Sequence, residues 1–458
     1  MRHLALNRST ARWTGLILGP VLALAAWLWV GAEGPGALSP AGRATASVAV
    51  LMACWWLTQA IPLAATALLP VLLFPLLGAG SAAEATAPYS RPLIFLFLGG
   101  FLLGLSLQKW GLHRRIALLT LLAFGTRPPR LVAGFMLATA VLSMWISNTA
   151  TVIMMLPIGV SVLETMRERL GGNLSKARHP GDRFSPALLL GIAYAASIGG
   201  IGTLIGTPPN LILAAFLQER FGTAISMLGW LPIGLPLVAA LLPLTWLYLT
   251  RIAFPIGHYS IRGGRELLRS QLIARGPMSR GERVVLIVFG LTALGWILRP
   301  KLAAWSGLTG IDDAVIAMAG ALALFLIPVE PGRQIFALDW ETARQLPWDI
   351  LILFGGGLSL AAAIERNGVD AFIAAALMGL QGMDLVWCLL AVTTLVVFLT
   401  EVTSNTAVTA TLLPVLAATA SALGLPPEPI LVAATLAASC AFMLPVATPP
   451  NAVVFASG

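Results

Sequence analysis

The stretch WISNTATVIMMLP, residues 145–157, interrupts an apolar run with three small polar residues and then resumes. The stretch TEVTSNTAVTATLLP, residues 400–414, does the same. The shared triplet is Ser-Asn-Thr, at 147–149 and at 404–406, and in each case Ala and an apolar run ending in Leu-Pro follow. A polar triplet used twice in apolar surroundings predicts a duplicated polar site.

The apolar surroundings extend over most of the chain. Of its 458 residues 58% are hydrophobic and 10% charged, with a mean hydropathy of +0.88, whereas soluble domains carry roughly 25% charged residues. Segments 14–31, 46–63 and 227–249 approach or exceed the ~20 apolar residues that cross a bilayer as a helix. The sequence therefore predicts an all-α, polytopic membrane protein whose main surroundings are a lipid bilayer.

The duplication reaches beyond the triplet. The same offset of 257 positions that relates Ser147 to Ser404 also aligns FLGGFLLGLSLQKWG (97–111) with FGGGLSLAAAIERNG (354–368). A second motif, GTPPN at 206–210 and ATPPN at 447–451, follows with an offset of 241, because the first half has extra polar residues within 167–185. An ordered set of matches of this kind predicts two structural repeats.

The charges predict that the two repeats have opposite orientations. Between residues 109 and 130 there are one lysine and four arginines without an acid, whereas the equivalent segment 365–384 has three acids and one arginine. The segment 251–283 carries seven arginines and two glutamates, and the N-terminus is basic. By the positive-inside rule the basic segments and the N-terminus face the cytoplasm, so we expect inverted repeats, as in many secondary transporters.

The polar interruptions predict the kind of site. The apolar runs on either side of each triplet are about 12–15 residues long, which suits a re-entrant helical hairpin with its tip at mid-membrane, where backbone lies against protein or water. Helix N-termini at such a tip suit an anion, and helix C-termini suit a sodium ion. The paired prolines of each Thr-Pro-Pro-Asn motif break a helix and free carbonyls near Gly206 and Ala447 for a cation.

Other classes of function receive little support from the sequence. There is no Walker A motif, the four histidines are scattered, and the net charge of +9 is explained by basic loops rather than by nucleic acid. A hydrolase with Ser147 or Ser404 as nucleophile would need a base close to either motif in the sequence, where there is none. Glu401 is the exceptional charge near the motifs, and neutral hydroxyls, amides and carbonyls suit sodium better than a proton relay.

These motifs resemble those of the divalent anion:sodium symporter family, the INDY-type dicarboxylate carriers of the solute carrier family 13 kind. The resemblance covers nearly the whole chain and is carried by SNTA twice, GTLIGTPPN (202–210), TEVTSNTA (400–407) and MLPVATPPN (443–451). It implies an elevator-type homodimer, each protomer with a scaffold and a moving transport domain. It also implies that the two triplets bind the carboxylates of the substrate beside sodium ions, without an organic cofactor.

Carried over by motif position, the resemblance implies two sodium sites and a substrate site. The first sodium site would use Ser143, Ser147, Asn148 and Gly206, and the second Thr400, Ser404, Asn405 and Ala447. The substrate would contact Ser147, Asn148, Thr149, Ser404, Asn405 and Thr406, with Thr207 and Thr448 close by. The expected activity is sodium-coupled symport of di- or tricarboxylates, foremost succinate, malate and fumarate. A sodium-independent dicarboxylate or citrate exchanger and a sulfate carrier remain alternatives.

The same reading divides the chain into four parts. We expect N-terminal scaffold helices over 1–90, the core of the first repeat over 91–226, scaffold helices with a basic cytoplasmic loop over 227–347, and the core of the second repeat over 348–458. Family members continue through one more transmembrane helix, so we expect that helix to be missing here. The predicted location is the cell (inner) membrane.

Overall fold

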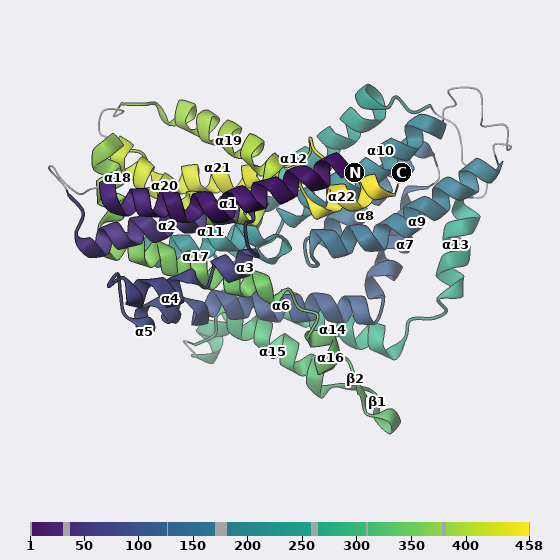
Figure 1. Ribbon diagram of the computed structural model, residues 1–458. Helices are drawn as coiled ribbons and strands as arrows, with labels where there is room; N and C mark the ends of the chain where they lie inside the picture. The colour runs from purple at the N-terminus through teal and green to yellow at the C-terminus, as the bar shows by residue number, and fades with distance from the viewer. Residues whose placement is uncertain are drawn as a thin grey trace. The chain divides into compact units, whose positions relative to one another are not determined.

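The computed structural model describes residues 2–30, 37–125, 127–169, 181–257, 264–307, 310–377 and 382–457. These ranges are almost entirely helical (Figure 1). Most of the extra polar stretch 167–185, and parts of the predicted loops 251–283 and 365–384, lie outside the described residues.

The chain divides into two compact units, and each is assembled from separated segments. Unit 1 comprises 1–95, 208–225 and 347–443, and unit 2 comprises 96–207, 226–346 and 444–458. The junctions at Thr207 and Pro208 and near Leu444 lie within or close to the two Thr-Pro-Pro-Asn motifs. Two of the five changes of unit therefore fall at or near the places where the sequence predicts a broken helix.

The elements that the structure describes in unit 1 are all helical. They are α1 (Arg2–Trp29), α2 (Pro40–Thr58), α3 (Leu63–Thr66), α4 (Leu69–Leu76), α5 (Ala82–Thr86), the 3-10 turn η1 (Ala87–Ser90), α11 (Pro208–Phe221), α17 (Trp348–Arg366), α18 (Val369–Leu377), α19 (Leu385–Val402), α20 (Asn405–Leu423) and α21 (Pro427–Ala438). The inserted helix α11 packs against α17, α20 and α21.

Unit 2 contains most of α6 (Pro92–Lys109), and then α7 (Leu112–Phe124), α8 (Pro128–Ser143), α9 (Asn148–Arg169), α10 (Gly181–Gly200), η2 (Leu204–Gly206), α12 (Met227–Leu247), η3 (Tyr248–Ala253), α13 (Gly264–Ala274), α14 (Arg280–Ser306), α15 (Asp313–Leu326), β1 (Pro328–Glu330), η4 (Pro331–Arg333), β2 (Ile335–Phe336), α16 (Trp340–Ala343) and α22 (Pro449–Ala456). The strands form an antiparallel pair. The last helix, α22, packs against α9 and α10.

Helices of the two halves begin at the predicted offsets. The starts of α7 and α18, of α8 and α19, and of α9 and α20 are each 257 positions apart, and those of α11 and α22 are 241 apart. Each Ser-Asn-Thr segment joins the two arms of a helical hairpin, and each Pro-Pro pair begins a new helix after a break. The repeated elements and broken helices are thus present, while the inverted orientation of the halves stays a prediction.

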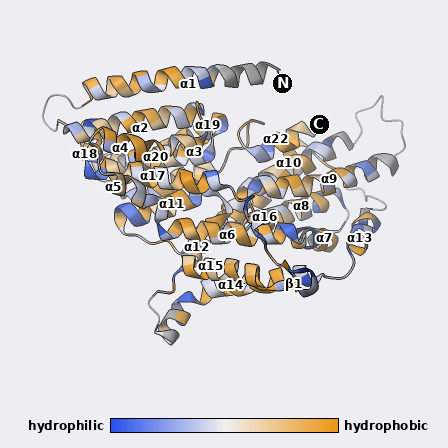
Figure 2. Cartoon of the chain, turned by 60° about the horizontal axis from the view of Figure 1, so that its bottom comes forward, coloured by the Kyte–Doolittle hydropathy of each residue, from blue (hydrophilic) through white to orange (hydrophobic). Residues whose placement is uncertain are grey.

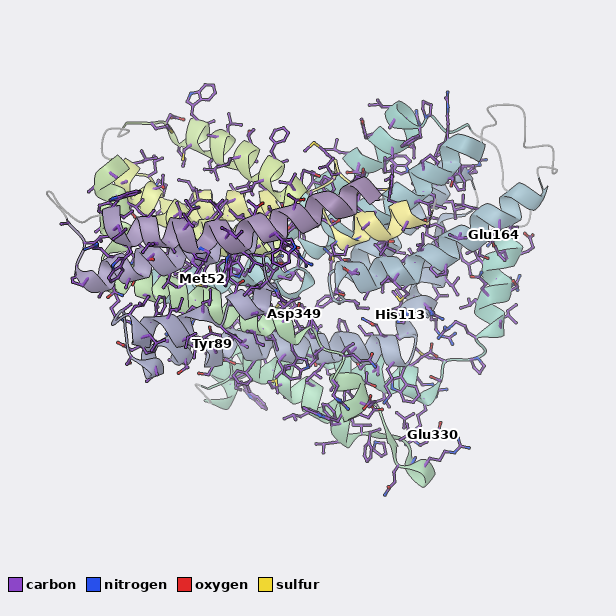
Figure 3. The ribbon with its side chains drawn as sticks, viewed as in Figure 1. Met52, Tyr89, His113, Glu164, Glu330 and Asp349 are labelled. Atoms are coloured by element: carbon purple, nitrogen blue, oxygen red, sulfur yellow. The ribbon has the colours of Figure 1, made fainter. Side chains whose placement is uncertain are left out.

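Glycines at equivalent positions of the two repeats both lie against the backbone of a neighbouring segment. A Cβ atom on Gly99 of α6 would lie 2.7 Å from the backbone carbon of Ala317, and one on Gly356 of α17 would lie 2.2 Å from the backbone oxygen of Ala67. Beside it, the ring of Tyr89, labelled in Figure 3, would be 2.0 Å from a Cβ on Gly355. The segments can approach each other this closely because no side chain lies between them at these positions. This requirement explains the adjacent glycines in both motifs.

Eight helices in the described ranges are long and apolar enough to cross a membrane, and the chain is a multi-pass membrane protein. Figure 2 shows α12, α14 and α15 as largely hydrophobic. The expected hairpin arms of 12–15 residues were too short: α8, α9, α19 and α20 have 16, 22, 18 and 19 residues. The four helices are longer than the apolar runs because each helix also includes polar residues at which the apolar run ends. The re-entrant path of the hairpins stays a prediction.

Candidate ion and substrate site

In unit 2, a group of oxygen atoms surrounds the end of the first hairpin arm. Ser143, the last residue of α8, is fully buried. Its hydroxyl lies 2.7 Å from Asn148 Oδ1 and 2.7 Å from the backbone oxygen of Ala196 in α10. Because a hydroxyl has a single proton to donate, three oxygens share one hydrogen. Neutral oxygen atoms in such a surplus are of the kind that hard cations prefer as ligands.

The broken helix completes this group. The helix α10 ends at Gly200, a 3-10 turn follows over 204–206, and α11 begins at Pro208. A Cβ atom on Gly200 would lie 2.6 Å from Asn148 Oδ1 and 3.2 Å from the backbone oxygen of Gly206. The Asn148 amide oxygen and the Gly206 carbonyl therefore both lie close to Gly200, where a side chain would displace the Asn148 amide. Of the first predicted sodium set, the structure brings Ser143, Asn148 and Gly206 to one location, next to Ser147.

A hydrogen bond that the sequence did not suggest fixes the turn in position. The buried hydroxyl of Thr203, between α10 and η2, donates to the backbone oxygen of Met144 at the end of the first hairpin arm. The unwound segment is thereby attached to the hairpin just before the polar triplet. Thr203 is part of the motif GTLIGTPPN (202–210), but the sequence assigned no role to it.

In unit 1, the second hairpin repeats the oxygen arrangement. The Thr400 hydroxyl is fully buried and lies 2.7 Å from Asn405 Oδ1 and 2.8 Å from the backbone oxygen of Ala438, at the end of α21. Ser143 and Thr400 are 257 positions apart, as are Asn148 and Asn405. The two units therefore contain the same hydroxyl–amide–carbonyl cluster, built from a serine in one and a threonine in the other.

The second predicted sodium set is divided between the units. Thr400, Ser404 and Asn405 lie in unit 1, whereas Ala447 lies in unit 2, just before α22. Within unit 1 the structure brings together the hydroxyl and amide of Thr400 and Asn405, and Ala447 belongs to the other unit. The first hairpin shares its unit with Thr448 and the start of α22, just as the second hairpin shares its unit with α11.

The triplets themselves lie at the N-termini of long helices. The helix α9 begins at Asn148 and α20 begins at Asn405. Ser147 is exposed, and Asn148, Thr149, Ser404, Asn405 and Thr406 are half-buried. A helix N-terminus carries about half a positive charge on its first N–H groups. Both tips therefore offer partly accessible, electropositive backbone and hydroxyl groups to an anion, without a basic side chain in either triplet.

Thr207 and Thr448 are placed alike at the two breaks. Each immediately precedes a Pro-Pro pair and the helix that follows, and each is buried, with 3% and 4% of its surface exposed. The Thr448 hydroxyl accepts a hydrogen bond of 3.3 Å from the backbone N–H of Asn451. The structure thus shows both threonines at helix starts, and their predicted proximity to the substrate stays a proposal.

Glu401 is a buried acid at the end of the second hairpin arm. Its carboxylate accepts a hydrogen bond of 2.9 Å from the backbone N–H of Met443, in the unwound segment after α21. The residue that corresponds to Glu401 in the first repeat, 257 positions earlier, is Met144. The backbone oxygen of Met144 accepts a hydrogen bond from the Thr203 hydroxyl. Both hairpins are thus tied to an unwound segment at equivalent positions, one through a carboxylate and one through a peptide oxygen.

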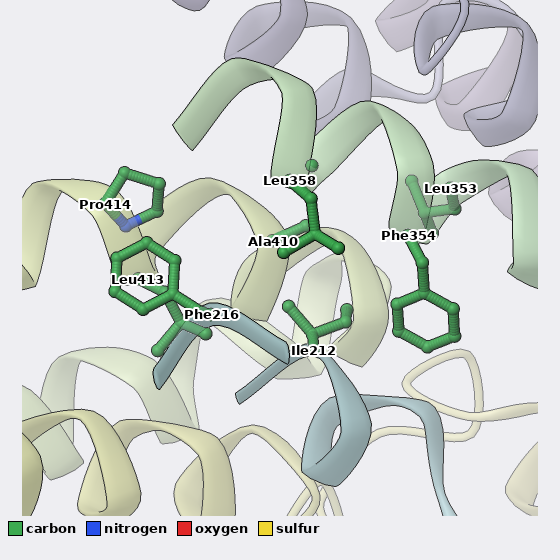
Figure 4. A pocket seen from close by; sticks show the side chains of 9 residues that line it. Ile212, Phe216, Leu353, Phe354, Leu358, Ala410, Leu413 and Pro414 are labelled. Carbon is green, nitrogen blue, oxygen red and sulfur yellow. The ribbon is translucent and has the colours of Figure 1, made fainter. Parts of the chain in front are cut away.

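Two further observations limit what the site can bind. In the ranges that the structure describes, no group of three His, Cys, Asp or Glu side chains is placed to hold a metal. A pocket in unit 1 between α11, α17 and α20, which Figure 4 shows with the rings of Phe216 and Phe354, has an apolar lining that offers no group to an anion.

Comparison with known proteins shows the family of the chain. The family model for the sodium:sulfate symporter transmembrane region matches residues 11–458. The chain belongs to this family of anion:sodium symporters. The chain is 43% identical over 448 residues to the sodium-dependent dicarboxylate transporter SdcS of Staphylococcus saprophyticus. The aligned region covers 97% of this chain and 85% of that relative. A protein of the same name from Staphylococcus aureus (strain MRSA252) is 41% identical over 454 residues, 98% of this chain and 86% of that one.

A solved structure has a similar fold. The YdaH transporter of Alcanivorax borkumensis aligns with a TM-score of 0.50 and 16% identity, over 85% of this chain and 80% of that chain. At this identity the likeness concerns the fold alone. These relatives are transporters and not enzymes, so the resemblance read from the motifs is confirmed and the hydrolase alternative falls away.

Proposed function

We propose that this protein is a sodium-coupled symporter of di- or tricarboxylates, with C4-dicarboxylates such as succinate, malate and fumarate as its main substrates. The observation that carries the proposal is the pair of buried oxygen clusters around Ser143 and Thr400, each beside the tip of a hairpin where the next helix begins. A cation ligand set and an anion-attracting helix end therefore lie within a few residues of each other, twice.

The geometry suggests how ion and substrate binding are coupled. A sodium ion coordinated by the Ser143, Asn148 and Gly206 oxygens would fix the Asn148 side chain, and the next residues, Thr149 and Ala150, form the first turn of α9. Fixing this turn directs its N–H groups, and the hydroxyls of the triplet, toward a substrate carboxylate. Asn405 would act in the same way at the start of α20. Binding of each ligand then favours binding of the other.

The comparisons support sodium and a dicarboxylate as the transported pair. Relatives with more than 40% identity are named sodium-dependent dicarboxylate transporters. The family description names sulfate, which keeps a sulfate carrier as the alternative substrate class. An exchanger without sodium is the second alternative, and it is disfavoured because both oxygen clusters contain neutral groups in place of a fixed cation.

The remaining architecture is proposed with the function. We infer inverted repeats with re-entrant hairpins, an elevator mechanism, a homodimer in the cell membrane, and a cytoplasmic N-terminus. The substrate would contact both triplets and lie close to Thr207 and Thr448. The four predicted parts, 1–90, 91–226, 227–347 and 348–458, remain the proposed division into scaffold and transport segments.

Uptake into proteoliposomes tests the function. Purified protein should accumulate labelled succinate under an inward sodium gradient and not when potassium or choline replaces sodium. Unlabelled malate, fumarate, citrate and sulfate added in excess would rank the substrates by competition. Equal uptake in sodium and in choline would refute the symporter, and inhibition by sulfate alone would identify the alternative substrate.

A further inference from the structure

The N-terminal end of α14 carries two arginines whose charge is not neutralised within the chain. Arg280 and Arg283 are exposed, and within the described ranges neither takes part in an ion pair. The guanidinium of Arg283 donates only to the backbone oxygen of Met278, at 3.1 and 3.2 Å. These two side chains therefore present positive charge to the surroundings.

The neighbouring carboxylate is already fully used. Glu282 is 2% exposed and accepts hydrogen bonds from Arg115 at 3.0 and 3.1 Å and from Arg275 at 3.4 Å. It also accepts from the backbone N–H of Ser279 at 2.8 Å, as the acid of a capping box. Since its oxygens point into this network, Glu282 does not compensate the two exposed arginines.

An exposed apolar stripe continues from the arginines along the same helix face. Residues 280, 283, 287, 291 and 294 follow helical spacing and lie within one narrow face. Ile287, Leu291 and Leu294 are 59%, 63% and 47% exposed. Beside them Gly290 carries no side chain, and no atom lies within 4 Å of the position of a Cβ, so a shallow depression flanks the stripe.

The opposite face of α14 is occupied by the protein itself. Val285, Val288 and Trp296 are buried, α14 packs against α15, and the Trp296 indole N–H donates to the backbone oxygen of Asp313 at 3.0 Å. The stripe is therefore the outward face of a helix that is long and apolar enough to cross the membrane. From residue 283 to residue 294 the helix rises about 16 Å, close to the ~15 Å depth of one hydrocarbon leaflet.

We propose that this face is a binding site for an anionic phospholipid. The lipid phosphate and its neighbouring headgroup oxygens bind Arg280 and Arg283, and an acyl chain lies along Ile287, Leu291 and Leu294 over the depression at Gly290. A zwitterionic lipid should bind more weakly, because its headgroup carries a positive charge that the two arginines repel. The site depends on membrane insertion alone, and not on which solute the protein transports.

Native mass spectrometry of the purified protein tests this site with phosphatidylglycerol, phosphatidylcholine and phosphatidylethanolamine of matched acyl chains. Wild-type protein should retain phosphatidylglycerol preferentially. The double variant Arg280→Gln/Arg283→Gln should weaken that binding about thirtyfold, because each basic residue near an anionic lipid surface contributes about fivefold. Gly290→Leu, which leaves the charges in place, should also reduce retention, by filling the depression.

The matched control uses two exposed arginines of the same unit that have carboxylate partners. Arg333 and Arg344 lie 3.4 and 3.3 Å from Glu330 and Glu341, so Arg333→Gln/Arg344→Gln should leave lipid retention unchanged. Size-exclusion profiles would show that all variants are folded. Equal retention of the three lipids by wild type, equal losses in test and control variants, or displacement of phosphatidylglycerol by inorganic phosphate would each overturn the proposal. Loss of a dimer in the test variant with unchanged lipid binding would identify the face as a subunit interface instead.

Discussion

Removal of the Ser143 or Thr400 hydroxyl is expected to weaken sodium binding specifically. Each hydroxyl is fully buried and lies 2.7–2.8 Å from an asparagine oxygen and a backbone oxygen. A hydrogen-bonding group directed at a charge contributes about 1.5–3 kcal/mol. Ser143→Ala and Thr400→Val should therefore raise the sodium concentration for half-maximal uptake about tenfold to a hundredfold.

The repeat supplies its own conservative controls. Because a serine performs in one unit what a threonine performs in the other, Ser143→Thr and Thr400→Ser keep the oxygen and should keep sodium affinity within a few-fold of wild type. The four variants thus distinguish the effect of the hydroxyl oxygen on sodium affinity from the effect of side-chain shape.

Thermal unfolding separates ion binding from a structural role. At a sodium concentration of a hundred times the dissociation constant, bound sodium stabilises the fold by about 2.7 kcal/mol, and a tenfold weaker site retains about 1.4 kcal/mol. A ligand role predicts that Ser143→Ala reduces the stabilisation gained on exchanging choline for sodium. A role in helix packing alone predicts equal losses of stability in both salts. Unchanged sodium affinity in both hydroxyl-free variants, at matched amounts of folded protein, would refute the reasoning.

Three further predictions follow from the described geometry. Asn148→Ala and Asn405→Ala should each weaken the affinities for sodium and for succinate together, by about tenfold or more, in titrations of purified protein. Asp at either position should lower the affinity for succinate further than the affinity for sodium. Wild-type affinities in the Ala variants would show that the two amides only join helices. Gly200→Ala should abolish uptake, because its Cβ would lie 2.6 Å from Asn148 Oδ1; normal uptake would exclude a close-packed amide. Single cysteines at Arg269 and Asp384, in a background without the three native cysteines, should be labelled from opposite sides of the membrane, and labelling from one side would contradict inverted repeats.

The sequence was sufficient to predict the breaks in the helices, since each follows from local chemistry. The Ser-Asn-Thr triplets separate α8 from α9 and α19 from α20, and the Pro-Pro pairs begin α11 and α22. The family and the hydroxyl–amide pairing could be read from the same motifs. Arm lengths could not, because a helix continues through polar residues that end an apolar run.

Other parts of the site depend on tertiary structure and have no signature in one sequence. The backbone oxygens of Ala196 and Ala438 complete the two clusters, yet nothing about an alanine in an apolar helix indicates that its carbonyl meets a hydroxyl more than 30 residues away. The division of Thr400 and Ala447 between units is likewise a property of how the chain crosses over. Such features follow from packing, which side-chain identity alone does not determine.

The differences between the halves indicate which atoms the site requires. The hydroxyl is supplied by Ser143 in one unit and Thr400 in the other, yet its distances to the amide and the carbonyl agree within 0.1 Å. The neighbouring position differs completely, with Met144 in one half and Glu401 in the other, although both connect the hairpin to an unwound segment. Because the oxygen cluster is reproduced with different side chains, whereas the connection to the unwound segment is made with different chemistry in each half, we propose that the ion binds at the hydroxyl and not at the Glu401 carboxylate.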